Sequence, residues 1–298
     1  MPPRRDARHI ALLTNPAAGK GRGRAARDVV LPRLEAAGHA VRSLEGRDAD
    51  HALELAREAV ADGVDALAVV GGDGMVNLAL QAVATSRVAL GLVPAGTGND
   101  VGRHLGLDRR DPLAAADRMI ASLATGRRER IDLARVGERY YATVMAAGFD
   151  AVVNERANAM RWPRGQMRYN LATLAELRTF TPLDYVLELD GETRRLAAML
   201  VAVGNGPSFG GGLRIAEGAR LDDGLLDVVV IKPVSKVELV RTYPKLFRGT
   251  HVTHPQYERH RVRRVTVTGP DVVGYADGER FGPLPLTVEC VPGAVELL

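Results

Sequence analysis

The chain has 298 residues, of which 46% are hydrophobic and 26% are charged, and its formal net charge is +4. This composition is typical of a folded protein, and the small positive charge argues against a nucleic-acid partner while leaving anionic substrates or membranes open. A single cysteine, Cys290, excludes an internal disulfide framework. The charged residues 1–9 are followed by an apolar run of only four residues, which argues against secretion, so we expect a cytoplasmic protein. The most apolar stretch, residues 196–203, is too short to cross a bilayer and predicts a core strand.

The first third of the chain alternates predicted strands with predicted helices. Residues 10–13 form a short apolar strand, and residues 24–37 carry apolar side chains at helical spacing. Further strands are predicted at 40–44, 66–70 and 88–93, with a second helix at 50–62. This alternation predicts a mostly parallel sheet covered by helices.

Three of these strands end in glycine-rich turns, at residues 14–23, 71–74 and 94–100. The carboxyl ends of parallel strands meet at one edge of a sheet, where open α/β sheets bind ligands, so we expect the three turns to gather there. Glycines let backbone N–H groups approach an oxygen-rich ligand such as a phosphate, which Asp73 can reach only through a cation or a hydroxyl. The structural alternative is a tight turn with Asp73 as helix N-cap.

Past residue 126 the pattern changes to strand-like alternation, which predicts a largely antiparallel β half with its boundary near residues 127–133. Two helical segments, at about 164–178 and 234–247, interrupt it. The strands are predicted at residues 130–136, 140–145, 183–189, 196–203, 225–231, 262–267 and 286–291.

The usual nucleotide-binding fingerprints do not fit this chain. Gly-x-Gly-x-x-Gly is missing after the first strand, and Gly19-Lys20 is followed by neither serine nor threonine. The motifs that do occur, in this order, are Asn15-Pro16 with Gly19, Gly71-Gly72-Asp73-Gly74 with Asn77, and Gly96-Thr97-Gly98-Asn99-Asp100. With these motifs the chain closely resembles the soluble bacterial members of the diacylglycerol kinase family of lipid kinases.

The resemblance continues into the β half and covers nearly the whole chain. The matching motifs there are Arg130-Ile131-Asp132-Leu133, Gly204-Asn205-Gly206, residues 209–212, residues 221–227 and Asp277-Gly278-Glu279. The resemblance implies an N-terminal, mostly parallel α/β domain of the NAD kinase and diacylglycerol kinase type over residues 1–132. It also implies a C-terminal antiparallel β-sandwich domain for the lipid over residues 133–298, with the active site in the cleft between them.

The resemblance assigns ATP and Mg²⁺ to the three glycine-rich turns. Asp73 and Asp100 would lie across the Mg²⁺ of the nucleotide, because a hard cation that bridges phosphates takes oxygen ligands. A helix N-cap before residues 101–105 is the structural alternative for Asp100, and Asp132 either joins this network or is only a turn residue. The implied ATP-binding residues are Asn15, Pro16, Gly19, Gly71, Gly72, Asp73, Gly74, Met75, Asn77, Gly96, Thr97 and Asn99.

Phosphorylation of an alcohol needs a base near the attacking hydroxyl. The resemblance places the base in Asp277-Gly278-Glu279, where we favour Glu279 and keep Asp277 and Asp73 among the catalytic residues. The structural alternative is a hairpin with Asp-Gly at its turn.

A second, structural Mg²⁺ site is implied at Asp223, with the backbone carbonyls of Arg220 and Leu225 as its other ligands. A metal-free hairpin before the following strand is the alternative there. The chain departs from the family at two places: Met75 replaces the usual threonine, and no threonine follows the second strand around Leu44-Glu45. These departures predict a changed affinity for, or choice of, the nucleotide.

The leading hypothesis is an ATP- and Mg²⁺-dependent kinase for the free hydroxyl of a membrane lipid, with diacylglycerol as the first candidate. Phosphatidylglycerol, sphingoid bases, ceramide-like lipids and polyprenols carry equally accessible hydroxyls. The alternatives are a kinase for a soluble alcohol, as in NAD kinases and phosphofructokinases, and a non-catalytic nucleotide-binding regulator, which Met75 suggests. A homodimer is left open.

Residues 161–169 suggest how the chain reaches a lipid substrate. Arg161, Arg164 and Arg168 alternate there with Trp162 and Tyr169, a mixture typical of segments at the headgroup layer of an anionic membrane. We therefore expect peripheral, salt-sensitive membrane contact. The structural alternative is a surface loop whose tryptophan packs on its own domain.

Overall fold

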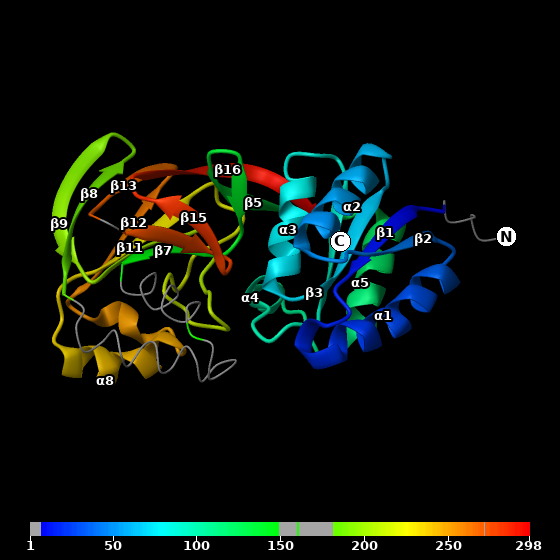
Figure 1. Cartoon of the computed structure of the whole chain (residues 1–298), viewed down its shortest axis with the longest axis horizontal. Coiled ribbons are helices and arrows are strands. Elements are labelled where there is room, and N and C mark those ends of the chain that lie inside the picture. Colours follow the sequence, from blue (N-terminus) through cyan, green and yellow to red (C-terminus); the bar gives the residue numbers. More distant parts are fainter. Residues whose placement is uncertain (1–6, 149–159, 161–180, 271) are drawn as a thin grey trace. The chain divides into compact units, whose positions relative to one another are not determined.

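The computed structural model describes residues 7–148, 160, 181–270 and 272–298 (Figure 1). The chain divides into two compact units, Met1–Leu133 with Val291–Leu298, and Ala134–Cys290. The first boundary lies next to the expected one, but the last residues differ from the expectation of a second domain running to 298. Strand β16 (Leu286–Leu297) pairs Leu297 in parallel with Leu90, and Leu298 joins the core of the first unit, so the chain end returns to that unit.

The first unit is a parallel sheet in the order β2-β1-β3-β4, which confirms the predicted α/β half. Every residue of β3 is buried, as expected for a strand covered on both faces. The elements are β1 (His9–Thr14), α1 (Ala18–Ala36), β2 (Ala40–Glu45), α2 (Ala49–Ala61), β3 (Ala66–Gly71), α3 (Asp73–Val83), β4 (Ala89–Pro94), α4 (Asp100–His104) and α5 (Pro112–Thr125).

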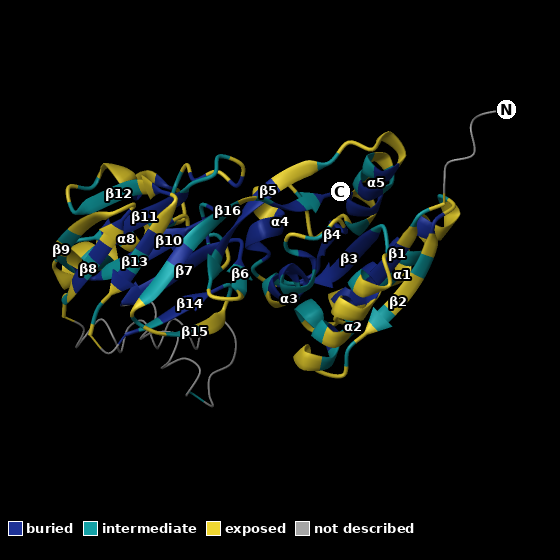
Figure 2. Ribbon diagram, turned by 90° about the horizontal axis from the view of Figure 1, so that it is seen from above, coloured by how far each residue is buried: buried dark blue, intermediate teal, exposed yellow. Residues whose placement is uncertain are grey.

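Helices α1 and α5 pack together on one face of this sheet, and α2 and α3 pack together on the other (Figures 1 and 2). Strands β1 and β3 are neighbours in the sheet, but the strand that follows each of them lies on its outer side: β2 beside β1, and β4 beside β3. The order of the strands therefore reverses between β1 and β3. At such a switch point the loops diverge and leave a crevice outside the carboxyl ends of the strands, which is where α/β proteins bind ligands.

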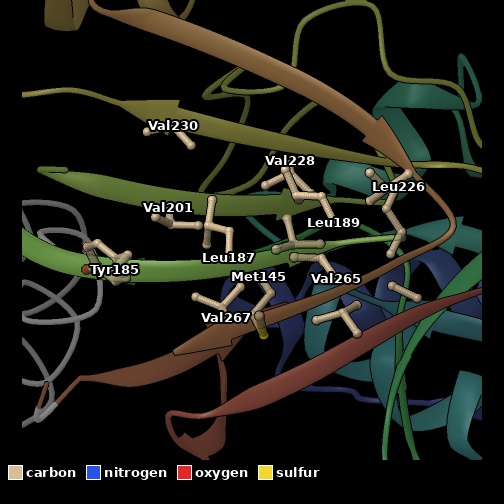
Figure 3. Close-up of a cluster of buried hydrophobic side chains, with 14 of the residues drawn as sticks. Met145, Tyr185, Leu187, Leu189, Val201, Leu226, Val228, Val230, Val265 and Val267 are labelled. Carbon is tan, nitrogen blue, oxygen red and sulfur yellow. The ribbon is translucent and has the colours of Figure 1, made fainter. Parts of the chain in front are cut away.

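The second unit is an antiparallel β-sandwich, as predicted. One sheet has the order β12-β11-β10-β7-β14-β15, and the facing one contains β16-β13-β8-β9. Figure 3 shows the core between them, where Met145, Val201 and Val228 of the first sheet meet Leu187 and Val265 of the second. The elements are β5 (Glu129–Val136), β6 (Arg139–Tyr141), β7 (Val144–Gly148), β8 (Leu183–Leu189), β9 (Glu192–Ala198), β10 (Leu200–Gly204), β11 (Leu226–Ile231), α8 (Lys236–Leu246), η1 (Thr250–Thr253), β12 (Tyr257–Val262), β13 (Arg264–Thr268), β14 (Val273–Ala276), β15 (Glu279–Pro283) and β16.

The apolar stretch at residues 196–203 is not the single core strand that its composition predicts. Strand β9 ends at Ala198 and β10 begins at Leu200, and the two strands belong to different sheets. At the junction the Met199 N–H donates to the carbonyl of Ile231 at 2.8 Å. The stretch is apolar because the chain crosses there from one buried sheet to the other.

The predicted helix at 234–247 is confirmed as α8, whereas the one at 164–178 and the membrane segment at 161–169 lie outside the described residues. Within the part of the chain that the structure describes, no helix has both the length and the apolar character needed to cross a bilayer.

Candidate functional site

The three glycine-rich turns lie together at the switch point of the first unit. The Asn15 N–H, just after β1, donates to the carbonyl of Val70 on β3 at 3.0 Å. The Ala95 N–H, just after β4, donates to the carbonyl of Gly71 at 2.7 Å. Arg22 then reaches from α1 to the third turn, where its Nη2 donates to the carbonyl of Gly96 at 2.8 Å. Hydrogen bonds therefore link all three turns into one cluster.

Two glycines allow the second and third turns to pack backbone against backbone. A Cβ placed on Gly96 would lie 2.5 Å from the Cα of Gly72, a distance that real Cβ atoms essentially never show. At Gly74, by contrast, a Cβ would meet no atom within 4 Å. Gly96 is thus required by the packing of the turns, and at Gly72 a Cβ would lie 3.0 Å from the Cα of Gly96, which is a tight fit. At Gly74 the backbone is uncovered and accessible to a ligand.

Asp73 ties the second turn to the third. Its Oδ2 accepts the Asn99 N–H at 2.7 Å and its Oδ1 accepts the Asp100 N–H at 2.6 Å. The N-cap of α3 is Gly72 and Asp73 is the first helical residue, so the alternative that made Asp73 the N-cap is wrong. The Asp73 carboxylate instead holds a backbone segment 26 residues further along the chain.

Asn99 fixes the shape of the third turn. Its backbone is in the left-handed region, with φ at 55°, which asparagine tolerates better than most residues. Its side chain forms two hydrogen bonds with Gly96, accepting the N–H at 2.9 Å and donating to the carbonyl at 3.0 Å. The buried Asn99 thus has a structural role within the turn, beside any contact with a ligand.

Asp73 and Asp100 border the same point in space. The position of a Cβ on Gly98 would lie 2.3 Å from Oδ2 of Asp73 and 3.6 Å from Oδ2 of Asp100. Asp100 is the first residue of α4 and Asn99 precedes it as N-cap, so the N-cap alternative for Asp100 is also wrong. Among the described residues no group of three or more acidic, histidine or cysteine side chains could hold a metal. Two carboxylates alone fit a Mg²⁺ that takes its remaining ligands from phosphates and water.

The other expected nucleotide residues surround this cluster. The Asn15 side chain accepts the Ala17 N–H at 3.1 Å beside Pro16, Asn77 is buried on α3, and Thr97 is exposed. The side chain of Met75 covers Gly71, where a Cβ would lie 2.5 Å from its Cγ. The residue at this position therefore packs on the turn.

Two further residues of the first unit have roles that the sequence did not settle. Asp132 is buried, and its Oδ1 accepts the Gly293 N–H at 2.8 Å, which joins β5 to the returning end of β16. The hydrogen bond from the Arg22 side chain to the third turn was not predicted from the sequence. The only signal in the sequence was its place within the basic, glycine-rich stretch of residues 19–23.

In the second unit the Asp277-Gly278 pair forms the turn of a hairpin between β14 and β15, as the structural alternative predicted. Both residues have positive φ, 52° and 84°, which is typical of a type I′ turn with Asp-Gly at its centre. Ala276 and Glu279 face each other as the last pair before the turn. The hairpin is compatible with a catalytic role, since a tight turn exposes the side chains at its ends.

The two carboxylates of this hairpin differ in their surroundings. The Asp277 carboxylate accepts the N–H groups of Ala142 and Thr143 at 3.3 and 3.2 Å, together with the Thr143 hydroxyl. The Glu279 side chain is exposed and makes no hydrogen bond or ion pair with another described residue. Burial, together with the nearby Asp277, raises the pKa of the Tyr141 hydroxyl well above its ordinary value, so this tyrosine stays neutral. Of the two carboxylates, Glu279 is the one whose side chain has no hydrogen-bond partner among the described residues.

The Asp223 turn lies just before β11 and is stabilised by an ion pair; it is not a hairpin, because the described residues between β10 and β11 form no strand. Asp223 Oδ1 accepts the Leu225 N–H at 3.1 Å, and Oδ2 is paired with Arg261. The Arg220 side chain pairs with the neighbouring Asp222 at 3.0 Å. In this structure the guanidinium of Arg261 pairs with the carboxylate expected to bind the second Mg²⁺, so a cation there would have to displace it, and we derive no step through it.

The strand beyond this turn carries a buried aspartate. Asp227 is 1% exposed and pairs with Arg259 at 2.5 Å. Burial raises the pKa of Asp227 above its ordinary value, against the opposing effect of Arg259. The pair sits inside the sheet and is structural.

A parallel α/β unit with glycine-rich turns at its switch point belongs to the class of α/β proteins that bind ligands at that place. Residues 9–136 match the family model of the diacylglycerol kinase catalytic domain, and residues 143–298 match that of the YegS C-terminal NAD kinase beta sandwich-like domain. The diacylglycerol kinase of Mycobacterium tuberculosis is 42% identical over 97% of this chain and 94% of its own length. The chain belongs to the diacylglycerol kinase family, and it is a kinase.

More distant relatives and solved structures agree with this assignment. The diacylglycerol kinase of Bacillus subtilis is 28% identical over 92% of this chain and 90% of its own. A diacylglycerol kinase structure from Bacillus anthracis superposes with a TM-score of 0.78, covering 98% of this chain and 97% of that one at 24% identity. An NAD kinase from Archaeoglobus fulgidus, solved with ATP, superposes with a TM-score of 0.56, covering 97% and 92% at 14% identity. At these identities the two structures show the fold alone.

Proposed function

We propose that this protein is an ATP- and Mg²⁺-dependent lipid kinase that phosphorylates the free hydroxyl of a membrane lipid, with diacylglycerol as the first candidate and phosphatidic acid as its product. The observation that carries the proposal is the cluster of three glycine-rich turns that Asp73 holds together at the switch point. Membership of the diacylglycerol kinase family supports the choice of a lipid acceptor. The ATP in the similarly folded archaeal NAD kinase supports the choice of nucleotide.

In this proposal the phosphates of ATP bind along the turns of the first unit. The uncovered backbone at Gly74 and the N-terminus of α3 offer N–H groups to phosphate oxygens, where the helix dipole also favours negative charge. Asp73 and Asp100 would hold the Mg²⁺. When bound, it would supply neutralisation of the charge on the transferred group.

Glu279 is the proposed base. It accepts the proton of the lipid hydroxyl as that oxygen attacks the γ-phosphorus and ADP leaves, a role that a free and exposed carboxylate can fill. Asp277 keeps the hairpin in place through the backbone of Ala142 and Thr143, which fixes where Glu279 is presented. Both carboxylates are present, which favours catalysis over a regulator that has lost it.

The test is transfer of radiolabel from γ-labelled ATP to a lipid extract by the purified protein. We expect labelled lipid with Mg²⁺ and none with EDTA, and thin-layer separation names the lipid. Label on NAD or on a sugar would instead support the soluble-alcohol kinase. Binding of ATP without transfer to any acceptor would support the regulator.

Four further points stay as predictions. Met75 in place of threonine predicts a changed nucleotide affinity, which ATP and GTP titrations measure. The second prediction is a Mg²⁺ site at Asp223, Arg220 and Leu225, and the third is a homodimer. The fourth is the cytoplasmic, peripherally membrane-associated location that residues 161–169 suggest.

A further inference from the structure

Exposed large apolar side chains gather on one short segment of the second unit. Of the seven in the described part of the chain, five lie between residues 237 and 252, on α8, just after it, and on η1. The other two, Val29 and Leu113, lie on separate helices of the first unit. The five are Val237 (60% exposed), Val240 (55%), Tyr243 (36%), Phe247 (45%) and Val252 (36%). A contiguous exposed apolar patch marks an interaction surface, whereas single exposed residues do not.

The apolar face of α8 is wider than the part that covers the sheet. Leu239, Thr242 and Leu246 are half-buried and form the inner stripe. The exposed residues Val240, Tyr243 and Phe247 each follow one position later, so their stripe is rotated by roughly 100° around the helix. No residue of α8 is buried. The helix therefore presents a second apolar stripe in which Val240 and Phe247 are 55% and 45% exposed.

A cavity of about 90 Å³ lies beneath the inner stripe. The opposite side of the cavity is lined by Leu200 and Ile231 of the sheet and by Leu213. The surface of its walls is almost entirely apolar. An engineered apolar cavity of about 150 Å³ stays dry and binds benzene, so a space of this size and character suits the end of a hydrocarbon chain. Hydrocarbon thus matches both the exposed stripe and the cavity next to it.

The charges around the patch select an anionic partner. Lys236, Arg241, Lys245 and Arg248 lie on or directly beside α8, and Glu238 is the only acidic residue of the helix. The Glu238 carboxylate is itself engaged, with Nε2 of His254 at 2.9 Å. Basic residues next to apolar and aromatic ones are typical of helices that lie in the surface of an anionic membrane.

We propose that the α8 surface, residues 236–253, docks on an anionic lipid bilayer with Val237, Val240 and Phe247 in the boundary between headgroups and acyl chains. The pair of exposed rings at Tyr243 and Phe247, 5.7 Å apart and edge to face, suits this boundary. The proposal rests on the proposed function, because a lipid kinase meets its substrate in a membrane. It assigns the membrane-facing side to residues distinct from 161–169.

The test is sedimentation of the full-length protein with vesicles of phosphatidylcholine, with and without phosphatidylglycerol, in the absence of ATP. We expect binding to the anionic vesicles, reduced at least about tenfold in the double variant Val240→Ser and Phe247→Ser. The matched control is Val29→Ser with Leu113→Ser, which removes similarly exposed apolar side chains from the first unit and should leave binding unchanged. Because all four residues are exposed, thermal unfolding of both variants should match that of the wild type.

Unchanged vesicle binding in the α8 variant would overturn the proposal. So would a wild type that self-associates in sedimentation velocity and a variant that loses only this self-association, since a second copy would then be the occupant. Equal loss in both double variants would show a general effect of surface polarity and would also overturn it. The vesicle assay contains no ATP, so a failure of the proposed kinase function leaves its result intact.

Discussion

The Asp73 turn of the first unit and the Asp277 hairpin of the second use the same device. In each, a carboxylate accepts two backbone N–H groups from a segment distant in sequence, Asn99 and Asp100 for Asp73, Ala142 and Thr143 for Asp277. In the first unit the carboxylate that builds the turn is also the one assigned to the metal. In the second unit the two tasks are divided, since Asp277 holds the hairpin and Glu279 is left free. Whether a carboxylate of the motif can act as a base therefore depends on its hydrogen-bond partners and not on its position in the motif.

The largest expected effect is that of Asp73→Asn, because this side chain has a structural role in the turn and also the proposed role of metal ligand. An amide accepts at one oxygen only, so one of the two N–H groups faces an NH₂ donor, and leaving such a group unsatisfied costs about 1–3 kcal/mol. We expect kcat to fall at least ~10²-fold and the melting temperature to fall while the protein still folds. Kinetics and calorimetry of the same preparation measure both effects.

The matched control is Asp62→Asn in the same unit. Asp62 forms an exposed ion pair with Arg42 at 2.9 Å, and exposed pairs contribute little. Its melting temperature and activity should stay close to those of the wild type. If Asp73→Asn loses stability but keeps full activity, Asp73 has only a structural role. The proposed difference between the two turns is then wrong.

A separation of effects is expected for the hairpin. Glu279→Gln should lower kcat at least ~10²-fold without changing the melting temperature, because the side chain is exposed and has no partner among the described residues of its unit. Asp277→Asn should lower the melting temperature, because the carboxylate accepts three hydrogen bonds. The two variants serve as controls for each other. Full activity in Glu279→Gln with loss of activity in Asp277→Asn would move the base by two residues.

The smallest effect is a difference between the units in mild acid. Burial lowers the pKa of the His251 imidazole below its ordinary 6.5, against the hydrogen bond to Ile215 and the charge of Glu217, while His254 lowers it further. The unfolded chain therefore binds more protons than the folded one just below pH 6.5, and the second unit loses stability as the pH falls through that range. Hydrogen exchange of peptides from each unit, measured at about pH 7 and about pH 5, should show faster opening around η1 in acid.

The stability of the first unit should depend less on pH in this range. A hydrogen bond from Arg130 lowers the pKa of Glu296 below its ordinary 4.5, so its contribution to stability is present above pH 4.5 and is lost only in stronger acid. Exchange in that unit should change little over the same range. The variant His251→Gln should remove the pH dependence of the second unit, and a dependence that persists in it would assign the effect to another group.

Local patterns in the sequence predicted the class of fold and the meeting of the three glycine-rich turns. Helical spacing and apolar runs depend on which face of a local element is buried, so they predicted the alternating α/β half, the antiparallel half and α8. The order of the glycine-rich motifs placed three turns at one sheet edge, where the structure also places them. These features follow from interactions between residues close in sequence and from the rules of parallel sheets.

Two kinds of feature depend on the tertiary structure: which polar groups form hydrogen bonds, and where the chain crosses from one sheet to the other. The return of Val291–Leu298 to the first unit, the break of the apolar stretch at Met199, and the bonds from Asp73 to Asn99 and Asp100 all join residues far apart in sequence. The same holds for the division of tasks between Asp277 and Glu279, which depends on the backbone of Thr143. An isolated sequence shows which residues can donate or accept, but the partner of each is fixed only when folding brings distant backbone groups within about 3 Å.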